Sequence, residues 1–186
     1  MKMTDYHNPV LLIETVDGLN IDENGTYVDV TFGGGGHSKE ILKRLGSNGR
    51  FLAFDQDQDA LLNRIDDSRF TLINENFRYL KRFLKFHGVM SIDGILADFG
   101  VSSHQFDVPE RGFSTRFEAN LDMRMNQQEE LSAFHVVNEY SESQLKQIFW
   151  QYGELRNTPK IARRIIDERS NGEILTSEHL KLILKI

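Results

Sequence analysis

Residues 26–97 alternate short runs of β-branched and aromatic residues with stretches of helical periodicity. Each intervening stretch is long enough to return the chain in a parallel direction, as in βαβ units. The runs are Thr26–Val30, Arg50–Phe54, Phe70–Asn74 and Asp93–Ala97, and the helical stretches lie near Ser38–Leu45, Asp59–Asp66 and Phe77–Phe86. We therefore predict an α/β fold with a parallel sheet of strand order 3-2-1-4, half of a doubly wound sheet.

The alternation stops after Ala97, and residues 100–126 contain few periodic apolar positions. A loop of this length is uncommon inside a compact domain and indicates a functional segment. A series of helices is predicted to follow, each with a capping signal at its start. These starts are Ser132, Ser141 with Gln144 three residues later, Thr158 with Pro159, and Thr176.

We expect two domains, residues 1–105 and residues 106–186. The fourth predicted strand would be an open edge, and the chain ends inside its last predicted helix without a stop signal. We interpret the chain as a fragment whose second, helical domain is incomplete.

The composition excludes several classes of protein. The chain has no cysteine, so it has no disulfide framework and no thiolate metal site, and its six histidines show no metal-ligand spacing. No segment approaches the roughly 18 consecutive apolar residues of a membrane span, and the first residues lack the apolar core of a signal peptide. We expect a cytoplasmic protein without a metal or a membrane partner.

The formal net charge of −6 disfavours broad binding to nucleic acid. Any contact with RNA must therefore be local. Basic side chains gather in Arg78–Lys85, where they alternate with aromatic residues, and in Arg156–Arg169. Either segment can also be a solvated helix face.

Four consecutive glycines, Gly33–Gly36, lie between the first predicted strand and the first helix. Glycine tolerates positive φ and lets a ligand approach the main chain, and the helix start offers N–H groups. A P-loop is excluded because Gly36 is followed by His37, where that motif needs Lys before its Ser or Thr. The dinucleotide fingerprint is incomplete because it would need glycine at Ser38, but an NAD-dependent oxidoreductase stays an alternative.

Three acids are predicted at the carboxyl ends of strands: Asp29, Asp55 and Asp98. Doubly wound sheets bind ligands at this edge, and carboxylates there would repel a pyrophosphate. S-adenosylmethionine (AdoMet) instead carries an ammonium and a sulfonium, and two opposite unit charges about 4 Å apart attract by a few kcal/mol. Asp55, about 20 residues beyond the glycines, is placed to accept hydrogen bonds from ribose hydroxyls, in NAD and AdoMet enzymes alike.

Four motifs in this order resemble the bacterial ribosomal RNA small-subunit methyltransferase H family, also called MraW. The motifs are Tyr27–Ser38, Ile92–Ser103, Glu110–Ser114 and Leu121–Met125. The resemblance runs from about Tyr6 to the last residue. It implies a class I (Rossmann-like) AdoMet methyltransferase core with an inserted helical substrate-recognition domain. It also implies N4-methylation of a cytidine in the decoding centre of 16S ribosomal RNA, in the small ribosomal subunit.

The resemblance also implies which residues contact AdoMet, namely Gly35, Gly36, His37, Asp55, Phe77, Asp98 and Gln105. We add Asp29, because of its charge, and Gly33, as part of the glycine loop. Members of the family continue well past the end of this chain.

An exocyclic cytosine amine is a poor nucleophile, so an enzyme must position it and accept its proton. We predict that Asp98 is the catalytic residue and orients the amine or the sulfonium. Arg111 and Phe113 are expected to help hold a base splayed out of its stack, with Arg124 as a further substrate residue. A non-catalytic RNA- or ribosome-binding fragment stays a second alternative.

Overall fold

The computed structural model describes residues 9–184 of the chain. The chain divides between Ser102 and Ser103 into two compact units. The division expected after Gln105 falls later than this, because the helix α4 (Ser103–Asp107) belongs as a whole to the second unit. The functional roles expected of the two domains stay predictions.

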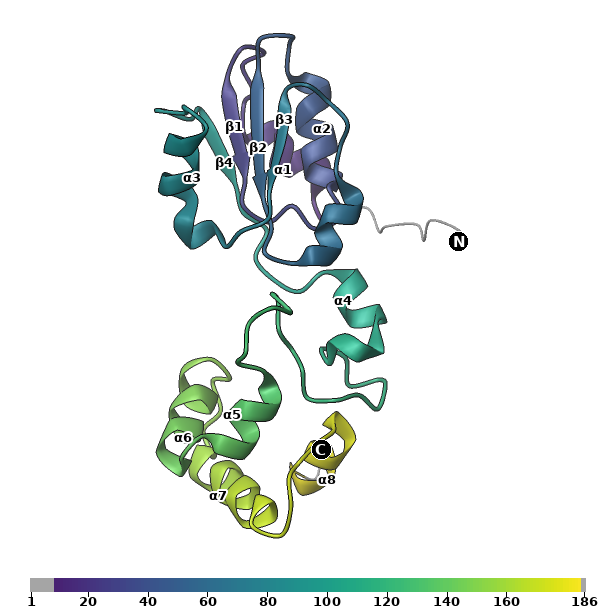
Figure 1. The fold of residues 1–186 in the computed structure, drawn as a ribbon, viewed down its shortest axis with the longest axis vertical. Helices are drawn as coiled ribbons and strands as arrows, with labels where there is room; N and C mark the ends of the chain where they lie inside the picture. The colour runs from purple at the N-terminus through teal and green to yellow at the C-terminus, as the bar shows by residue number, and fades with distance from the viewer. Residues whose placement is uncertain (1–8, 185–186) are drawn as a thin grey trace. The chain divides into compact units, whose positions relative to one another are not determined.

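Four parallel strands form the sheet of the first unit (Figure 1). They are β1 (Thr26–Asp29), β2 (Arg50–Phe54), β3 (Phe70–Ile73) and β4 (Gly94–Leu96). Their order is β3-β2-β1-β4, which confirms the predicted order. Because β2 and β4 flank β1, the chain winds to one side of β1 first and to the other side later. The carboxyl ends of β1 and β4 are therefore the switch point at which such sheets bind ligands.

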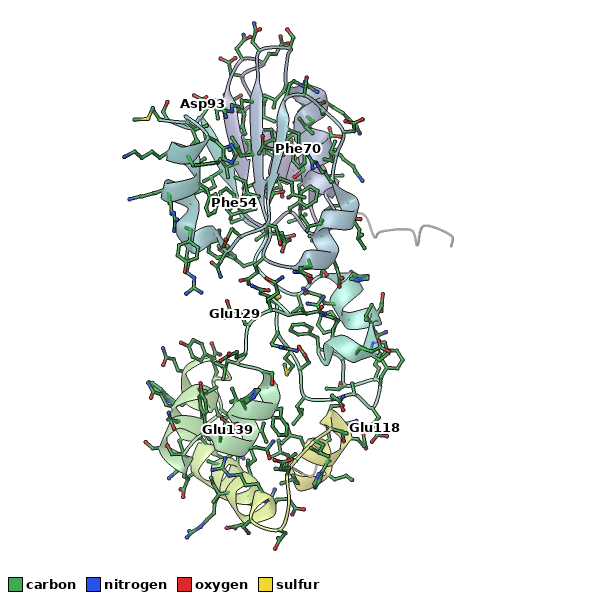
Figure 2. All side chains as sticks on the ribbon, viewed as in Figure 1. Phe54, Phe70, Asp93, Glu118, Glu129 and Glu139 are labelled. Atoms are coloured by element: carbon green, nitrogen blue, oxygen red, sulfur yellow. The ribbon has the colours of Figure 1, made fainter. Side chains whose placement is uncertain are left out.

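Helices cover both faces of this sheet (Figure 1). On one face, α1 (Leu12–Gly18) and α2 (Gly36–Arg44) pack with Tyr27, Phe51 and Phe70. On the other face, α3 (Leu80–Phe86) packs with Val28, Leu52 and Phe54. Phe54 and Phe70, labelled in Figure 2, thus belong to opposite cores. Since successive strand residues point to opposite faces, a sheet buried on both faces needs the continuous apolar runs seen in the sequence.

Three helical segments of the first unit differ from the prediction. The sequence did not predict α1, in which only Val16 is fully buried. The helix expected at Asp59–Asp66 is a short 3-10 helix, η1 (Gln58–Asn63), and Leu62 within it is 86% exposed, so no apolar face extends it. The helix expected at Phe77–Phe86 begins as a 3-10 turn, η2 (Phe77–Tyr79), and continues as α3.

The second unit is helical, as predicted. Its elements are α4 (Ser103–Asp107), η3 (Pro109–Arg111), α5 (Ala133–Glu139), α6 (Glu142–Gln151), α7 (Thr158–Arg169) and α8 (Ser177–Leu184). Ser132 and Ser141 cap α5 and α6, each in a capping box. The core of the unit contains Leu121, Val137, Leu145, Ala162, Ile165 and Ile174.

Residues 100–126 form an ordered loop that contains only the short α4 and η3. A β-bridge between Asn120 and Thr176 joins the loop to the start of α8. Within residues 9–184, no helix has both the length and the apolar character that a bilayer crossing requires.

The fully buried Ile165 of α7 generates a stability prediction for the second unit. Ile165→Ala leaves a cavity in that core and is expected to lower the free energy of unfolding by about 2–5 kcal/mol. Urea denaturation followed by tryptophan fluorescence measures this, because the only tryptophan, Trp150, lies in α6 of the same unit. The control is Leu182→Ala on α8, where the side chain is 69% exposed and the change should stay within about 0.5 kcal/mol. Equal effects of the two substitutions would contradict the observed core.

Candidate functional site

The glycine loop after β1 is fastened to the strand beside it. The backbone N–H of Gly33 donates to Oδ2 of Asp55, at the end of β2, over 2.7 Å. The carbonyl of Gly33 accepts from Nδ2 of Asn63 at 3.1 Å, and the N–H of Phe32 donates to the carbonyl of Phe54 at 3.0 Å. These bonds hold the loop at the carboxyl edge of the sheet.

The glycines of the loop serve different purposes. Gly33 has a φ of +50°, and a Cβ built on it would meet no atom closer than 4.0 Å. A Cβ on Gly35 would lie 2.9 Å from the ring of Phe32, and one on Gly36 would lie 2.3 Å from Cγ of Pro9. Packing therefore excludes side chains at Gly35 and Gly36, whereas the bare backbone at Gly33 faces open space that a ligand can occupy.

Asp29 lies at the end of β1 and is only 1% exposed. Its Oδ1 accepts from the backbone N–H of Thr31 at 2.9 Å and from the Thr31 hydroxyl at 3.3 Å, and its Oδ2 accepts from the hydroxyl of Ser38 at 2.8 Å. Burial raises the pKa of this carboxyl, although the hydrogen bonds from Thr31 and Ser38 and the nearby His37 act in the opposite direction. Asp29 is thus engaged in holding the loop, and its contact with a cofactor stays a prediction.

Thr31 links β1 to β4, a role that the sequence reasoning missed. Its hydroxyl accepts from the backbone N–H of Asp98 at 2.7 Å while donating to Asp29. Asp29 and Thr31 have the spacing of an Asx turn, in which an Asp side chain accepts from the backbone N–H two residues further on. This spacing is the feature of the sequence that could have indicated a structural role for Thr31. Asp98 follows β4 with an exposed side chain, so the structure fixes its backbone and leaves its carboxylate accessible.

Asp55 has hydrogen-bonding capacity left for a ligand. Its two oxygens accept from the N–H groups of Gly33 and Asp57, at 2.7 and 2.9 Å. The backbone N–H of Gln56 also bonds to this carboxylate. An ionised carboxylate offers about four acceptor sites, so about one remains for a ribose hydroxyl. Burial is the main reason why the pKa of Asp55 is raised, with the charge of Asp57 adding to it against the backbone hydrogen bonds.

His37 lies on the first turn of α2 and is 6% exposed. Its Nε2 atom is buried and has no hydrogen-bond partner within the described part of the chain. Leaving such an atom unsatisfied costs about 1–3 kcal/mol, and native proteins rarely tolerate it without a ligand or water. This buried nitrogen fits a polar ligand beside the glycine loop.

Two phenylalanines lie near each other beyond β3 and β4. The ring centroids of Phe77 and Phe99 are 5.6 Å apart, and the side chains are 41% and 71% exposed. Phe77 was predicted from the family resemblance, and Phe99 was not. Exposed aromatic rings at the carboxyl edge of the sheet suit the stacking of a flat base.

The remaining predicted residues lie in the second unit. Gln105, predicted to contact AdoMet, is 4% exposed, and its Nε2 is 3.4 Å from Sδ of Met125. Its contact with the cofactor stays a prediction.

Arg111 is buried, although the sequence suggested contact with a base. It is 2% exposed, and its Nη2 donates to the carbonyls of Arg124 and Met125 at 3.0 and 3.4 Å. Its guanidinium lies 5.9 Å from the ring centroid of the partly buried Phe113. The next residue, Gly112, has a φ of +73°, and a Cβ there would lie 2.6 Å from the carbonyl of Asn120. Arg111 thus organises its loop, and the substrate roles of Arg111 and Phe113 stay predictions.

Arg124 is paired within its own motif. Its Nη2 lies 2.5 Å from Oδ2 of Asp122, and its Nη1 donates to the carbonyl of Glu129 at 2.8 Å. Burial alone would raise the pKa of Asp122, but the hydrogen bonds from Arg124 outweigh it and the pKa is lowered. The proposed contact of Arg124 with substrate stays a prediction.

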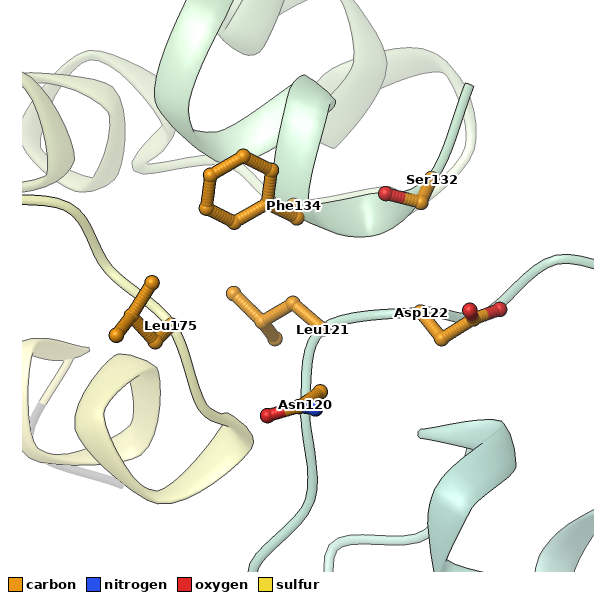
Figure 3. A pocket seen from close by; sticks show the side chains of 6 residues that line it. All are labelled: Asn120, Leu121, Asp122, Ser132, Phe134 and Leu175. Atoms are coloured by element: carbon orange, nitrogen blue, oxygen red, sulfur yellow. The ribbon is translucent and has the colours of Figure 1, made fainter. Parts of the chain in front are cut away.

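A pocket of ≈ 340 Å³ opens within the second unit (Figure 3). It is lined by Asn120, Leu121, Asp122, Ser132, Phe134 and Leu175. The close-up shows the Phe134 ring and the Leu121 and Leu175 side chains on one side, with Asp122 and Ser132 on the other. None of the residues predicted to bind cofactor or substrate lines this pocket. One lining residue, Asp122, forms an ion pair with Arg124, which was predicted to contact the substrate.

Comparison with known proteins gives consistent matches. A family model described as the MraW methylase family matches residues 4–186. A relative from Christiangramia forsetii is 66% identical over 185 residues, covering 100% of this chain and 61% of the relative. One from Flavobacterium johnsoniae is 66% identical over 181 residues, and one from Bacteroides fragilis is 56% identical over 181, each covering 97% of this chain and 60% of the relative. All three are named "Ribosomal RNA small subunit methyltransferase H". The chain therefore spans 60–61% of the length of these curated relatives.

The buried Asp29 generates a prediction about pH. Because its folded-state pKa is raised above the ordinary value of 3.8, the folded state holds this proton more tightly than the unfolded state. The stability from this group is present below pH 3.8 and is lost as the pH rises through the raised pKa. Asp29→Asn cannot ionise, so the stability of the unsubstituted protein relative to this variant should fall over that pH window.

Urea denaturation followed by circular dichroism, repeated between about pH 3.5 and 8, measures the difference. Parallel stability curves for the two proteins over this range would contradict the assigned burial of the Asp29 charge.

Proposed function

Since the chain belongs to the MraW methylase family, we propose that it contains the cofactor-binding core, and part of the recognition domain, of an AdoMet-dependent ribosomal RNA methyltransferase. The proposed substrate is the N4 amine of a cytidine in the decoding centre of 16S ribosomal RNA, and the proposed place of action is the cytoplasm. The names of the relatives support a substrate in the small ribosomal subunit. The family resemblance of the motifs supports the cytidine N4.

One observation carries the cofactor assignment: the glycine loop is held at the end of β2 by the hydrogen bond from Gly33 to Asp55 and has open space at Gly33. The N–H of Gly33 is bonded to Asp55, and the unsatisfied Nε2 of His37 lies on the helix that follows. A rigid bare-backbone turn with acids nearby suits a nucleoside that carries positive charge. It suits a pyrophosphate poorly, because the exposed Asp98 and the partly buried Asp55 would repel the phosphates.

The residues present fit AdoMet in distinct roles. Asp55 retains acceptor capacity for a ribose hydroxyl, and Phe77 with Phe99 offers an aromatic surface for the adenine. The Nε2 of His37 can take one polar group of the cofactor. When bound, AdoMet supplies the methyl group on an electrophilic sulfonium.

Asp98 is the best candidate for handling the amine of the substrate. Its backbone is held by the hydroxyl of Thr31 at 2.7 Å, while its carboxylate is exposed at the switch point. A carboxylate placed beside the exocyclic amine accepts a hydrogen bond from it, which orients the nitrogen and favours loss of its proton. Thr31 and Asp29 act here as positioning residues, since Thr31 bonds the backbone of Asp98 and Asp29 bonds Thr31.

Cofactor binding by this chain can be tested with S-adenosylhomocysteine and a matched pair of glycine variants. Gly33→Ala places a methyl group in the open space of the loop and is expected to lower the affinity at least about tenfold, as one lost polar contact would. Gly88→Ala, after α3, imposes a similar backbone strain, with a φ of +70° and nothing within 4 Å, away from the loop. The affinity should therefore stay unchanged in this control.

Isothermal titration calorimetry measures the affinities, and a thermal shift checks that ligand binding stabilises the fold. Binding of NADH in place of S-adenosylhomocysteine, or an equal loss of affinity in the two variants, would count against the assignment.

The role of Asp98 is tested by Asp98→Ala in a protein of the relatives' full length. We expect turnover on undermethylated small ribosomal subunits to fall by about 10²–10⁴, the usual contribution of a positioned proton acceptor. The circular dichroism spectrum should not change, because the side chain is exposed. Turnover within about twofold of the unsubstituted enzyme would refute the role.

A further inference from the structure

The side chain of Gln56 connects two parts of the proposed cofactor site. Gln56 directly follows Asp55, the proposed acceptor for the ribose, and its Oε1 accepts from Nδ2 of Asn76 at 2.7 Å. Asn76 directly precedes Phe77, which is proposed to offer a stacking surface to the adenine. The ribose and the base of a nucleoside are joined by a single bond, so a side chain that links these two positions lies close to the base.

The backbone on both sides of Gln56 is held by hydrogen bonds. Nδ2 of Asn74, the residue after β3, donates to the carbonyl of Asp55 at 2.8 Å and to that of Asp57 at 3.4 Å. The backbone N–H of Asp57 donates to Oδ1 of Asp55 at 2.9 Å. The main chain at Gln56 is therefore fixed, and the contact with Asn76 decides how the Gln56 amide is presented.

The orientation of the Asn76 amide follows from its other contact. Asn76 is the N-cap of η2, and its Oδ1 accepts from the backbone N–H of Arg78 at 2.9 Å. A backbone N–H can only donate, so the atom of Asn76 that meets it must be the oxygen, and the NH₂ group must take the other position. That NH₂ group also can only donate, so the atom of Gln56 that meets it must be the oxygen.

The NH₂ group of Gln56 is thereby left as an available donor. Gln56 is partly buried, and within residues 9–184 its Nε2 has no hydrogen-bond partner. The backbone N–H of the same residue is engaged by the carboxylate of Asp55. The side chain is therefore the group through which Gln56 can donate to a ligand.

We propose that Gln56 is a specificity-determining residue for the cofactor: its Nε2 donates to a ring nitrogen of the adenine, and Asn76 is the positioning residue that orients its amide. The ring nitrogens N1, N3 and N7 of adenine accept hydrogen bonds, whereas its exocyclic amine donates them. An amide presented through its nitrogen suits a ring nitrogen, and one presented through its oxygen would suit the amine instead. The proposal rests on the proposed function and adds to it the recognition of the base.

Analogues of S-adenosylhomocysteine in which C–H replaces N1, N3 or N7 of the adenine test this contact. Isothermal titration calorimetry of the unsubstituted chain should give one of these analogues an affinity about fivefold lower than that of S-adenosylhomocysteine, because one neutral hydrogen bond is lost. The ratio of these two affinities, called here the deaza ratio, is the readout. It reports on binding alone and requires no turnover.

Two substitutions separate the donor from the residue that orients it. Gln56→Met removes the donor at a similar side-chain length, so the deaza ratio should fall to about one. Asn76→Asp keeps the oxygen that caps η2 but removes the NH₂ group, so the Gln56 amide turns over, donates to the new carboxylate and presents its oxygen to the base.

The deaza ratio of Asn76→Asp should therefore also fall to about one. The charge that this substitution introduces acts equally on S-adenosylhomocysteine and on the analogue, so it cancels in the ratio. The circular dichroism spectrum should not change, because the cap of η2 is kept.

Gln58→Met is the matched control, because Gln58 is an exposed glutamine at the start of η1, close to Gln56 in the chain. It should keep the deaza ratio of about five. Equal affinities for S-adenosylhomocysteine and every analogue would overturn the proposal, as would a ratio that survives in Gln56→Met or is lost in Gln58→Met. A ratio that survives in Asn76→Asp would overturn the role of Asn76.

The same titrations distinguish this proposal from the proposed function. Failure of the unsubstituted chain to bind S-adenosylhomocysteine rejects the proposed function, and the role of Gln56 with it. Binding of S-adenosylhomocysteine without any discrimination against the analogues rejects the role of Gln56 alone.

Discussion

The candidate site depends on one hydrogen bond, from the backbone N–H of Gly33 to the carboxylate of Asp55 at 2.7 Å. It joins the loop after β1 to the end of β2, so a glycine-rich segment that would otherwise sample many conformations is held in one. The Asp29–Thr31–Asp98 connection does the same on the opposite side of β1. With both neighbours of β1 attached, the loop is ordered from strand to helix and presents an open face at Gly33.

The three acids at the carboxyl edge of the sheet, Asp29, Asp55 and Asp98, differ in burial and therefore in role. The buried Asp29 is hydrogen-bonded by Thr31 and Ser38, so its carboxyl group organises the loop and is shielded from solvent. Asp55 is partly buried and keeps spare acceptor capacity, whereas Asp98 is exposed. The charge argument for a cationic nucleoside therefore depends on Asp55 and Asp98, and Asp29 contributes through geometry.

The sequence predicted the strand order because apolar runs buried on both faces of a sheet are a strong signal, and it predicted the capped helices because Ser141 and Gln144 have an unambiguous spacing. It could not reveal contacts that depend on tertiary structure. The burial of Arg111 arises from carbonyls 13 and 14 residues further along the chain, and the bond from Asp98 to Thr31 spans 67 residues. The sequence also could not reveal that η1 is a 3-10 helix, because the pattern of apolar residues does not show that Leu62 remains exposed and packs against no core.

The central claim is that the face of the loop at Gly33 receives the nucleoside of the cofactor. Proton–nitrogen NMR spectra of the labelled chain, recorded with and without S-adenosylhomocysteine, test it most directly. The account predicts that the largest shifts fall on the amides of Gly33, Asp55 and Asp98 and on the imidazole nitrogens of His37. Shifts confined to other strands or to the second unit, or no shifts at saturating ligand, would contradict it.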